Sequence, residues 1–325
     1  MHSCKEQGGL AGMRAETRAN DKEKVREHYD RMSPYYHSLW GEHIHHGYWI
    51  RGDESKETAQ VQLIEHLAGA AGISRGAKIL DVGCGFGASS IYLARKYGAE
   101  ATGITISQVQ VEMANQAAAK AGVNARFVLM DAEAMMFEDS FDVVWSVESI
   151  SHYQDIPKFF AAAAALLRPG GTVAITDWFK KEGLTPREHK KFLHDLEHGM
   201  MVELQTMEDY ASHMAAAGLE VTRSEVLNKY CAKTWDFCLD IIKDKALWGL
   251  AAQNGADFVR FLRAFKDMRA GFASGNFVYG LMAAKKSPGQ AGQTIVPKVQ
   301  IHYDNVDFSY KDVNNRFGCY GIRGG

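Results

Sequence analysis

A short glycine-rich segment contains the residues best suited to binding a ligand. Residues 81–88 read DVGCGFGA and stand between an apolar stretch typical of a strand and a run typical of a helix. Glycines accept a positive φ and let a ligand approach the backbone, and a helix start offers unpaired N–H groups. The pattern Gly83-x-Gly85-x-x-Ala88 fits the dinucleotide fingerprint. We therefore predict a site for an adenosine-containing cofactor.

The position of the nearest acidic residue indicates which cofactor this is. An NAD site has an acid about 20 residues after the glycines, where it binds the ribose. Thr105 stands at that place, and the acid comes before the glycines instead, as Asp81. A carboxylate at the end of the first strand suits a ligand with an ammonium group. S-adenosylmethionine has such a group and NAD does not, so the sequence favours S-adenosylmethionine.

Further polar residues follow the third predicted strand, residues 125–129. In an open α/β sheet, ligands bind outside the carboxyl ends of the strands. Asp131 can accept a hydrogen bond from the adenine amino group there, while a nearby backbone N–H, such as that of Ala132, reaches a ring nitrogen. The alternative is that Asp131 is only a turn residue. Gln110 is similarly ambiguous, because Ser107 to Gln110 also reads as a capping box.

Three histidines, His43, His45 and His46, lie in one short segment and invite a metal interpretation. A metal site needs convergent ligands with supporting partners. No Asp or Cys follows at a known spacing, so polar lining is the favoured interpretation and no metal is predicted. His46, beside Gly47, is a candidate for facing the substrate.

The elements that position these residues alternate along the chain. Strands are expected at 78–81, 101–104, 125–129, 141–146 and 172–176, with helices between them. This alternation predicts a parallel, doubly wound sheet of the Rossmann-like α/β class. After Asp177 the pattern changes to helices over 184–217 and 232–272, with strands at 219–226 and 277–284. The expected sheet thus has seven strands and is mostly parallel.

The motifs resemble those of a known enzyme family. Residues 81–87 resemble the first motif of class I S-adenosylmethionine-dependent methyltransferases. Residues 103–110, GITISQVQ, resemble the second-strand segment of a branch that holds tocopherol C-methyltransferases, cyclopropane fatty acid synthases and many natural-product methyltransferases. Residues 39–49, LWGEHIHHGYW, are similar to a segment of tocopherol-type enzymes. The resemblance covers about residues 25–286.

This resemblance implies roles for residues on the cofactor side. It places Gln110 on the ribose of the cofactor, beside Thr105 and Ile106. A sulfonium favours aromatic faces and backbone carbonyls. The candidates for this contact are Tyr36 or Tyr35 and the carbonyl near Val147.

On the acceptor side, the resemblance places a histidine, here His152, close to the transferred methyl group. Tocopherol-type enzymes usually show Glu-His at this point, whereas this chain shows Ser151-His152. Glu148 would replace the missing carboxylate if the segment is helical, because residues i and i+4 share a face. His152 is then either a general base or a structural residue that caps the next segment or bonds to the lid.

The resemblance also implies a domain organisation. A methyltransferase domain is expected over 21–286, with an N-terminal helical lid at 21–75 and helical insertions at 177–217 and 229–275. These insertions would form a greasy, partly methionine-lined acceptor pocket. Residues 1–20 are expected to be disordered, and residues 287–325 to be an extension outside the fold.

Composition sets wider limits. The 325 residues are 46% hydrophobic and 23% charged, with a net charge of −2 and no dominant basic block. A nucleic-acid partner and a membrane span are therefore not expected. Five scattered cysteines show no disulfide or zinc spacing, which fits a reducing, cytoplasmic setting. The expected enzyme methylates a small, rather apolar metabolite as a monomer or homodimer. The alternatives are an isoprenoid or fatty-acyl C-methyltransferase or cyclopropane synthase, and a non-catalytic cofactor-binding regulator.

Overall fold

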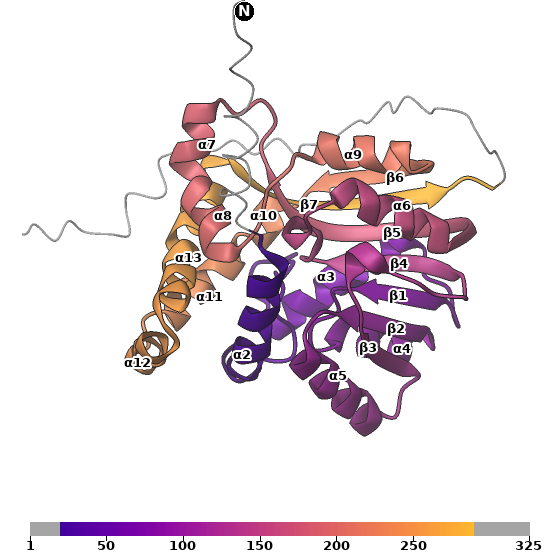
Figure 1. Ribbon diagram of the computed structural model, residues 1–325, viewed down its shortest axis with the longest axis horizontal. Helices are drawn as coiled ribbons and strands as arrows, with labels where there is room; N and C mark the ends of the chain where they lie inside the picture. The colour runs from indigo at the N-terminus through magenta and orange to yellow at the C-terminus, as the bar shows by residue number, and fades with distance from the viewer. Residues whose placement is uncertain (1–19, 289–325) are drawn as a thin grey trace, which may run out of the picture.

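The computed structural model describes residues 20–288 and contains one seven-stranded sheet flanked by helices (Figure 1). The strand order is β3-β2-β1-β4-β5-β7-β6, in which β7 is antiparallel to β5 and β6 and the other neighbours are parallel. The strands are β1 Lys78–Val82, β2 Glu100–Thr105, β3 Ala125–Leu129, β4 Phe141–Val147, β5 Leu167–Lys180, β6 Leu219–Val226 and β7 Phe277–Lys286. The predicted fold class is confirmed.

Helices cover both faces of the sheet, as a doubly wound fold requires. One face packs against α3 (Lys56–Ala71) and α4 (Ala88–Tyr97), and the other against α6 (Ile156–Leu166) and α9 (Met207–Ala216). The helix α5 (Gln108–Ala121) packs beside β3. A hydrophobic core lies on each face of the sheet. Buried apolar side chains that alternate along β1 and β4 point into one core and then the other.

The remaining helices gather at one end of the sheet (Figure 1). They are α2 Lys22–Trp40, α7 Pro186–Phe192, α8 His194–Met200, α10 Asn228–Cys231, α11 Lys233–Ile241, α12 Lys245–Asn254 and α13 Ala256–Ser274. The helix α13 packs against α8, α11 and α12, and α2 packs against α5. Two 3₁₀ turns, η1 Ala132–Ala134 and η2 Ile150–His152, follow β3 and β4.

The structure divides the helical segments differently from the sequence prediction. In segment 21–75, α3 packs on the sheet, as its apolar period indicated, whereas α2 and the loop at residues 42–46 line the cavity described below. In segment 177–217, α9 covers the sheet, and its Met207 and Met214 belong to the core beside α6. Of the four methionines in segment 177–217, Met200 lines the cavity, whereas Met201 ends α8 with a φ of 56°.

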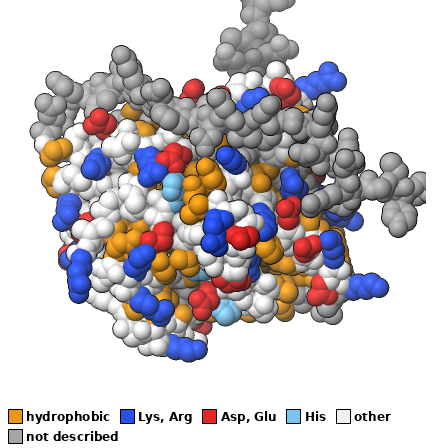
Figure 2. All heavy atoms as spheres, turned by 180° about the vertical axis from the view of Figure 1, so that it is seen from behind, with side chains coloured by type: hydrophobic (Ala, Val, Ile, Leu, Met, Phe, Trp, Pro, Cys, Tyr) orange, Lys and Arg blue, Asp and Glu red, His pale blue; other side chains and the backbone are white. Residues whose placement is uncertain are grey.

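Charge is mixed on the face shown in Figure 2. Lys and Arg side chains alternate there with Asp and Glu, so neither sign dominates this face of the described chain. Between residues 20 and 288, no helix has the length and apolar character needed to cross a bilayer. The predictions for residues 1–19 and for nearly all of 287–325 lie outside the described residues.

Candidate active site

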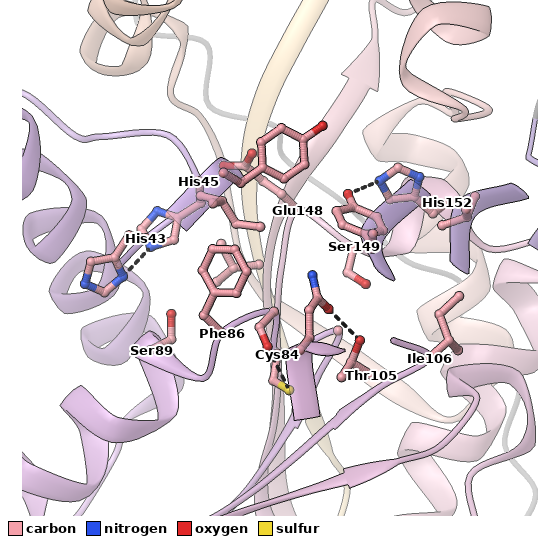
Figure 3. Close-up of a pocket in the computed structure, with 18 of the residues that line it drawn as sticks. His43, His45, Cys84, Phe86, Ser89, Thr105, Ile106, Glu148, Ser149 and His152 are labelled. Carbon is pink, nitrogen blue, oxygen red and sulfur yellow. Dashed lines mark hydrogen bonds between the residues drawn. The ribbon is translucent and has the colours of Figure 1, made fainter. Parts of the chain in front are cut away.

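A single cavity at the carboxyl ends of the strands collects the residues that the sequence singled out (Figure 3). It lies between β1, β2, β4 and the helices α2, α11 and α13. Except for Tyr35, the predicted site residues line it: Tyr36, His46, Asp81, Gly83, Gly85, Thr105, Ile106, Gln110, Asp131, Ala132, Val147, Glu148 and His152. They converge because parallel strands end at the same edge of the sheet.

The glycine turn between β1 and α4 forms part of the cavity wall. Gly83 and Gly85 have φ values of 76° and 52°, which favour glycine. A Cβ on Gly83 would lie 1.9 Å from the Ser149 hydroxyl, so packing alone requires glycine there. A Cβ on Gly85 would have the Ile44 Cδ1 atom as its nearest neighbour, at 3.7 Å. This opening at Gly85 leaves room for a ligand against the backbone.

Asp81 is a buried carboxylate, 2% exposed, that accepts a hydrogen bond from the Ser90 hydroxyl at 2.7 Å. Within the described chain, no Lys, Arg or His forms an ion pair with it. Burial raises the pKa of Asp81 to about 7. An unpaired buried acid of this kind fits the ammonium group of S-adenosylmethionine, which would supply the missing opposite charge.

Thr105 and Gln110 form one hydrogen-bonded unit beyond the end of β2. The Thr105 hydroxyl donates to the Gln110 side-chain oxygen at 2.7 Å and accepts from the Ser107 N–H at 3.2 Å (Figure 3). Ser107 caps α5 by accepting from the Gln110 N–H, but the Gln110 side chain does not cap in return. The predicted capping box is thus only half formed, and the Gln110 amide group is left for the cavity.

Asp131 follows β3 and is paired with Lys22 at the start of α2, with the Lys22 Nζ 2.6 Å from its Oδ2. The same Nζ lies 2.7 Å from Glu133 Oε2. Burial lowers the pKa of Lys22, but these two carboxylates outweigh that effect and raise it above its usual value. The side chain of Asp131 also accepts from the Glu133 N–H, as a turn residue would. The N-terminus of α2 is thereby fastened to the edge of the cavity.

The structure separates the two candidate tyrosines. Tyr36 lines the cavity, and its hydroxyl is 2.6 Å from the His28 Nε2 atom. Tyr35 points outward from α2 and is 37% exposed. Tyr36 is therefore the residue of this pair that can meet a ligand.

Glu148 occupies the turn after β4 with a φ of 52°, which is uncommon for a residue other than glycine. Its Oε1 accepts from the N–H and Nδ1 of His46, at 2.6 and 2.9 Å, and from the Tyr279 hydroxyl at 2.8 Å. Its Oε2 accepts from the Trp178 indole at 3.2 Å. Burial raises the pKa of Glu148, but the charge and hydrogen bonds of His46 outweigh it and leave the pKa below its usual value. Glu148 is therefore an ionised carboxylate fixed by four donors.

The predicted i, i+4 pairing of Glu148 with His152 is wrong. The residues from Glu148 to His152 do not form an α-helix, because Glu148 is left-handed and only the turn η2 follows. Figure 3 shows Glu148 and His152 at separate places in the cavity. Glu148 is paired with His46, more than 100 positions earlier in the chain.

His152 has a defined tautomer. Its Nδ1 lies 3.0 Å from the Met201 carbonyl, which only accepts, so Nδ1 carries the proton. Its Nε2 is then unprotonated and lies 3.3 Å from the Tyr29 hydroxyl. Burial lowers the pKa of His152, although the Met201 carbonyl and the charge of Glu148 act the other way. His152 is therefore a neutral imidazole. Its basic nitrogen, Nε2, faces Tyr29, which also lines the cavity.

The other histidines form a neutral pair. The His45 Nδ1–H donates to the His46 carbonyl at 2.8 Å, so its Nε2 accepts from the His43 Nδ1–H at 3.2 Å (Figure 3). Burial lowers the pKa of His43 to about 3 and also lowers that of His45. Among residues 20–288, no three His, Cys, Asp or Glu side chains converge as metal ligands.

Four residues that build this site were not predicted from the sequence, namely Tyr29, Lys22, Trp178 and Tyr279. Tyr29 had a detectable signal, because it precedes Tyr36 by two helical turns and so shares its face. Trp178 and Tyr279 lie on β5 and β7, and nothing in their local sequence indicates a contact with Glu148.

The fold and this cavity define a class I S-adenosylmethionine-dependent methyltransferase. More particularly, the chain belongs to the mycolic acid cyclopropane synthetase family, whose model matches residues 16–268. It is thus an enzyme that uses S-adenosylmethionine as its methyl donor.

Two curated relatives are methyltransferases. The 27-O-demethylrifamycin SV methyltransferase of Amycolatopsis mediterranei is 35% identical, over 74% of this chain and 90% of the relative. The chloroplastic tocopherol O-methyltransferase of Arabidopsis thaliana is 29% identical, over 81% of each chain.

Solved structures share the fold. The 4+2-cyclase SpnF has a TM-score of 0.73 and 26% identity, over 82% of this chain and 96% of its own. The mycolic acid cyclopropane synthase CmaA1, complexed with S-adenosylhomocysteine, has a TM-score of 0.73 and 23% identity, over 81% of this chain and 98% of its own. SpnF is a cyclase, so the fold alone does not decide the reaction.

Proposed function

We propose that this enzyme transfers a methyl group to a hydroxyl of a small, rather apolar acceptor. The cavity walls on the acceptor side support an apolar molecule, since they are formed by Trp40, Met200, Trp235, Phe261 and Phe265. One curated relative is a tocopherol O-methyltransferase, and the other is a 27-O-demethylrifamycin SV methyltransferase, whose substrate has a methylatable oxygen. Together these features favour a hydroxyl group of an apolar molecule as the methyl acceptor.

The single observation that carries the proposal is the unprotonated Nε2 of His152 in the cavity. A hydroxyl is a weak nucleophile until a base accepts its proton. The Met201 carbonyl fixes the tautomer of His152 with Nε2 basic, and its lowered pKa keeps it neutral near pH 7. The anion of Glu148 would favour the imidazolium once it forms, because it raises the pKa of His152.

We further propose how the chain holds its cofactor. When bound, S-adenosylmethionine supplies an electrophilic methyl group on a sulfonium. Asp81 would hold the ammonium group, and the backbone of Gly83 and Gly85 would lie against the methionine part. Thr105, Ile106 and Gln110 would hold the ribose. Asp131 and the N–H of Ala132 would hold the adenine, and the ring of Tyr36 and the Val147 carbonyl would lie near the sulfonium.

The domain organisation follows as a proposal. The lid would be α2, and the helices α8, α11 and α13, which carry cavity-lining residues, would enclose the acceptor. The enzyme would act on a free small molecule as a monomer or homodimer and without nucleic acid.

A second candidate is methyl transfer to an unsaturated isoprenoid or fatty-acyl chain. The ionised Glu148 favours it, because a fixed carboxylate beside aromatic rings would stabilise a cationic carbon intermediate. The family description also names a cyclopropane synthetase.

An acceptor panel separates the candidates. The full chain is incubated with S-adenosylmethionine and with 27-O-demethylrifamycin SV, tocopherols, simple apolar phenols or unsaturated phospholipid vesicles, and S-adenosylhomocysteine release is measured. Methylation of hydroxyl acceptors supports the proposal, whereas methylation of the vesicle lipids alone supports the second candidate. Binding of S-adenosylmethionine in calorimetry without turnover of any acceptor would favour a non-catalytic regulator.

The role of His152 is tested with the same assay. His152→Ala should lower kcat by about 10²-fold or more with cofactor affinity nearly intact, because the loss of a general base affects the chemical step. Turnover of the parent should fall only at acid pH, with its midpoint below the usual 6.5 of histidine, since the pKa of His152 is lowered. A variant that loses melting temperature but keeps turnover per folded molecule would show a structural role instead.

A further inference from the structure

The basic nitrogen of His152 already has a partner in the lid helix. The Tyr29 hydroxyl lies 3.3 Å from the His152 Nε2, and the two rings meet edge to face with centroids 5.9 Å apart. Because Nδ1 carries the proton of His152, the only possible direction is donation from the Tyr29 O–H to Nε2. An acceptor hydroxyl therefore cannot bond to this nitrogen while Tyr29 stays in place.

The position of Tyr29 is fixed from several sides. Its ring packs edge to face on His28, 5.5 Å between centroids, and against Tyr36 at 6.5 Å. One residue further along α2, the Asp30 carboxylate accepts from the Ser107 hydroxyl at 2.6 Å, which fastens this turn of the helix to the start of α5. Tyr29 also lines the cavity, so its oxygen can meet an acceptor.

Resting on the proposed function, we propose that Tyr29 is a catalytic residue that relays the proton from the acceptor hydroxyl to His152. A phenolic oxygen can donate one hydrogen bond and accept others at the same time. The Tyr29 oxygen would therefore accept the acceptor O–H while its own O–H donates to His152. In this arrangement α2 supplies part of the catalytic machinery as well as a wall of the cavity.

The step balances. A bond forms between the acceptor oxygen and the methyl carbon as the bond between that carbon and the sulfonium sulfur breaks. The acceptor proton moves to the Tyr29 oxygen, and the Tyr29 proton moves to the His152 Nε2. The positive charge of the sulfonium ends on the His152 imidazolium, and Tyr29 ends neutral. Burial raises the pKa of the Tyr29 hydroxyl well above its usual value, so it passes a proton on without remaining ionised.

The parent and four variants of the full chain test the relay: Tyr29→Phe, His152→Ala, the double variant, and Tyr35→Phe. Tyr35 is the matched control, because it lies on the outer face of the same helix and is 37% exposed. Turnover is measured with the fastest hydroxyl acceptor of the panel, and melting temperature and S-adenosylmethionine affinity are measured for each variant.

Tyr29→Phe should lower kcat by about 10- to 100-fold, within the range for proton transfer by a positioned group. The double variant should lose no more than His152→Ala alone, because residues that act as one unit are not additive. Tyr35→Phe should match the parent. An unchanged kcat in Tyr29→Phe, or fully additive losses in the double variant, would overturn the relay. Retained turnover in His152→Ala would instead reject the proposed base.

A second measurement does not depend on turnover. Nitrogen NMR of the His152 ring, in the full chain with S-adenosylhomocysteine added, should show the proton on Nδ1. The Nε2 resonance should shift in Tyr29→Phe, since its hydrogen bond is lost, and should stay in place in Tyr35→Phe. A proton on Nε2 of the parent, or no shift in Tyr29→Phe, would contradict the relay.

Discussion

At the scale of single residues, Asp81 has a direct electrostatic consequence for cofactor binding. Its pKa is raised from 3.8 to about 7 by burial. Between these values the folded protein holds a proton that the unfolded chain has released. The contribution of Asp81 to stability is therefore fully present below pH 3.8 and is lost as the pH rises toward 7. An ammonium ligand binds the ionised form of Asp81. The affinity for such a ligand should therefore rise with pH, whereas the contribution of Asp81 to stability falls.

We predict that the affinity for S-adenosylmethionine rises between pH 5.5 and 7 and that binding at pH 6 releases a proton. Asp81→Asn should weaken binding by about 2–3 kcal/mol near neutral pH, the scale of a lost hydrogen bond to a charged group. It should also remove the pH dependence over this range. Calorimetry in buffers of different ionisation enthalpy measures both effects.

The exposed Asp139 provides the control, because Asp139→Asn changes the same group outside the cavity. Parent protein that binds equally well at pH 5.5 and 7 would contradict the proposed contact.

Residue types, strand ends and the family resemblance were enough to place a set of residues in the cavity, but not Lys22, Tyr29 or Trp178, which also line it. Asp81, Thr105, Asp131 and Val147 stand at or just after the ends of four parallel strands, and topology brings such positions together. The partners of these residues were not predictable in the same way. The ion pair between Lys22 and Asp131, for example, joins positions far apart in the sequence. Such pairs leave no periodic signal in the sequence.

At the scale of elements, the helices α8 and α9 show that an apolar period does not determine what a helix packs against. The period predicts a helix with one buried face, but it does not say what covers that face. The methionines of α9 meet the sheet and α6, whereas Met200 of α8 meets the cavity. The strand β5 spans Leu167–Lys180 rather than the predicted 172–176, and Gly170 and Gly171 lie within it.

The joint between β5 and η2 depends on Asp177, which is fully buried. Its carboxylate accepts from the Ser151 N–H and hydroxyl, at 2.9 and 3.1 Å, and from the Tyr210 hydroxyl at 2.9 Å. It also accepts from the Trp178 N–H at 2.8 Å. Asp177 thus holds the turn that carries His152 and the residue whose indole bonds to Glu148.

We predict that Asp177→Ala lowers the free energy of unfolding by about 1–3 kcal/mol or more, because it leaves buried donors unsatisfied. It should also lower kcat while S-adenosylmethionine affinity stays close to that of the parent, since Asp177 does not belong to the cofactor half of the cavity. Denaturant titration and turnover per folded molecule measure the two effects.

Tyr210→Phe is the milder comparison, because it removes one donor and keeps the carboxylate. Burial also raises the pKa of Asp177 to about 7, so the stability cost of Asp177→Ala should be larger at pH 5 than at pH 8. A parent-like stability for Asp177→Ala would show that η2 is held by other contacts.

At the scale of the whole molecule, the cavity is built from distant parts of the chain. Residues of α2 form one wall, residues at the strand ends form another, and residues of α11 and α13 close the acceptor side. The last strand β7 also contributes to the site, because its Tyr279 hydroxyl donates a hydrogen bond to Glu148. The integrity of β7 is therefore a condition for the site.

The last prediction concerns the end of the chain. The strand β7 ends at Lys286, and the family model matches no further than residue 268. Residues 287–325 contain no periodic apolar face in their sequence, so nothing predicts an element that packs on the sheet. A chain truncated after Ser287 should keep the melting temperature and turnover of the parent.

Truncation after Met282 is the matched control for this experiment. It removes the pairs Val173↔Ala284 and Thr172↔Lys285 between β5 and β7, and also the pairing of this stretch with β6. Because Ala283 and Ala284 are fully buried and pair with both β5 and β6, this shorter chain should unfold or lose most of its stability. If truncation after Ser287 causes a comparable loss, the tail contributes to the fold; if only turnover falls, it acts on the site.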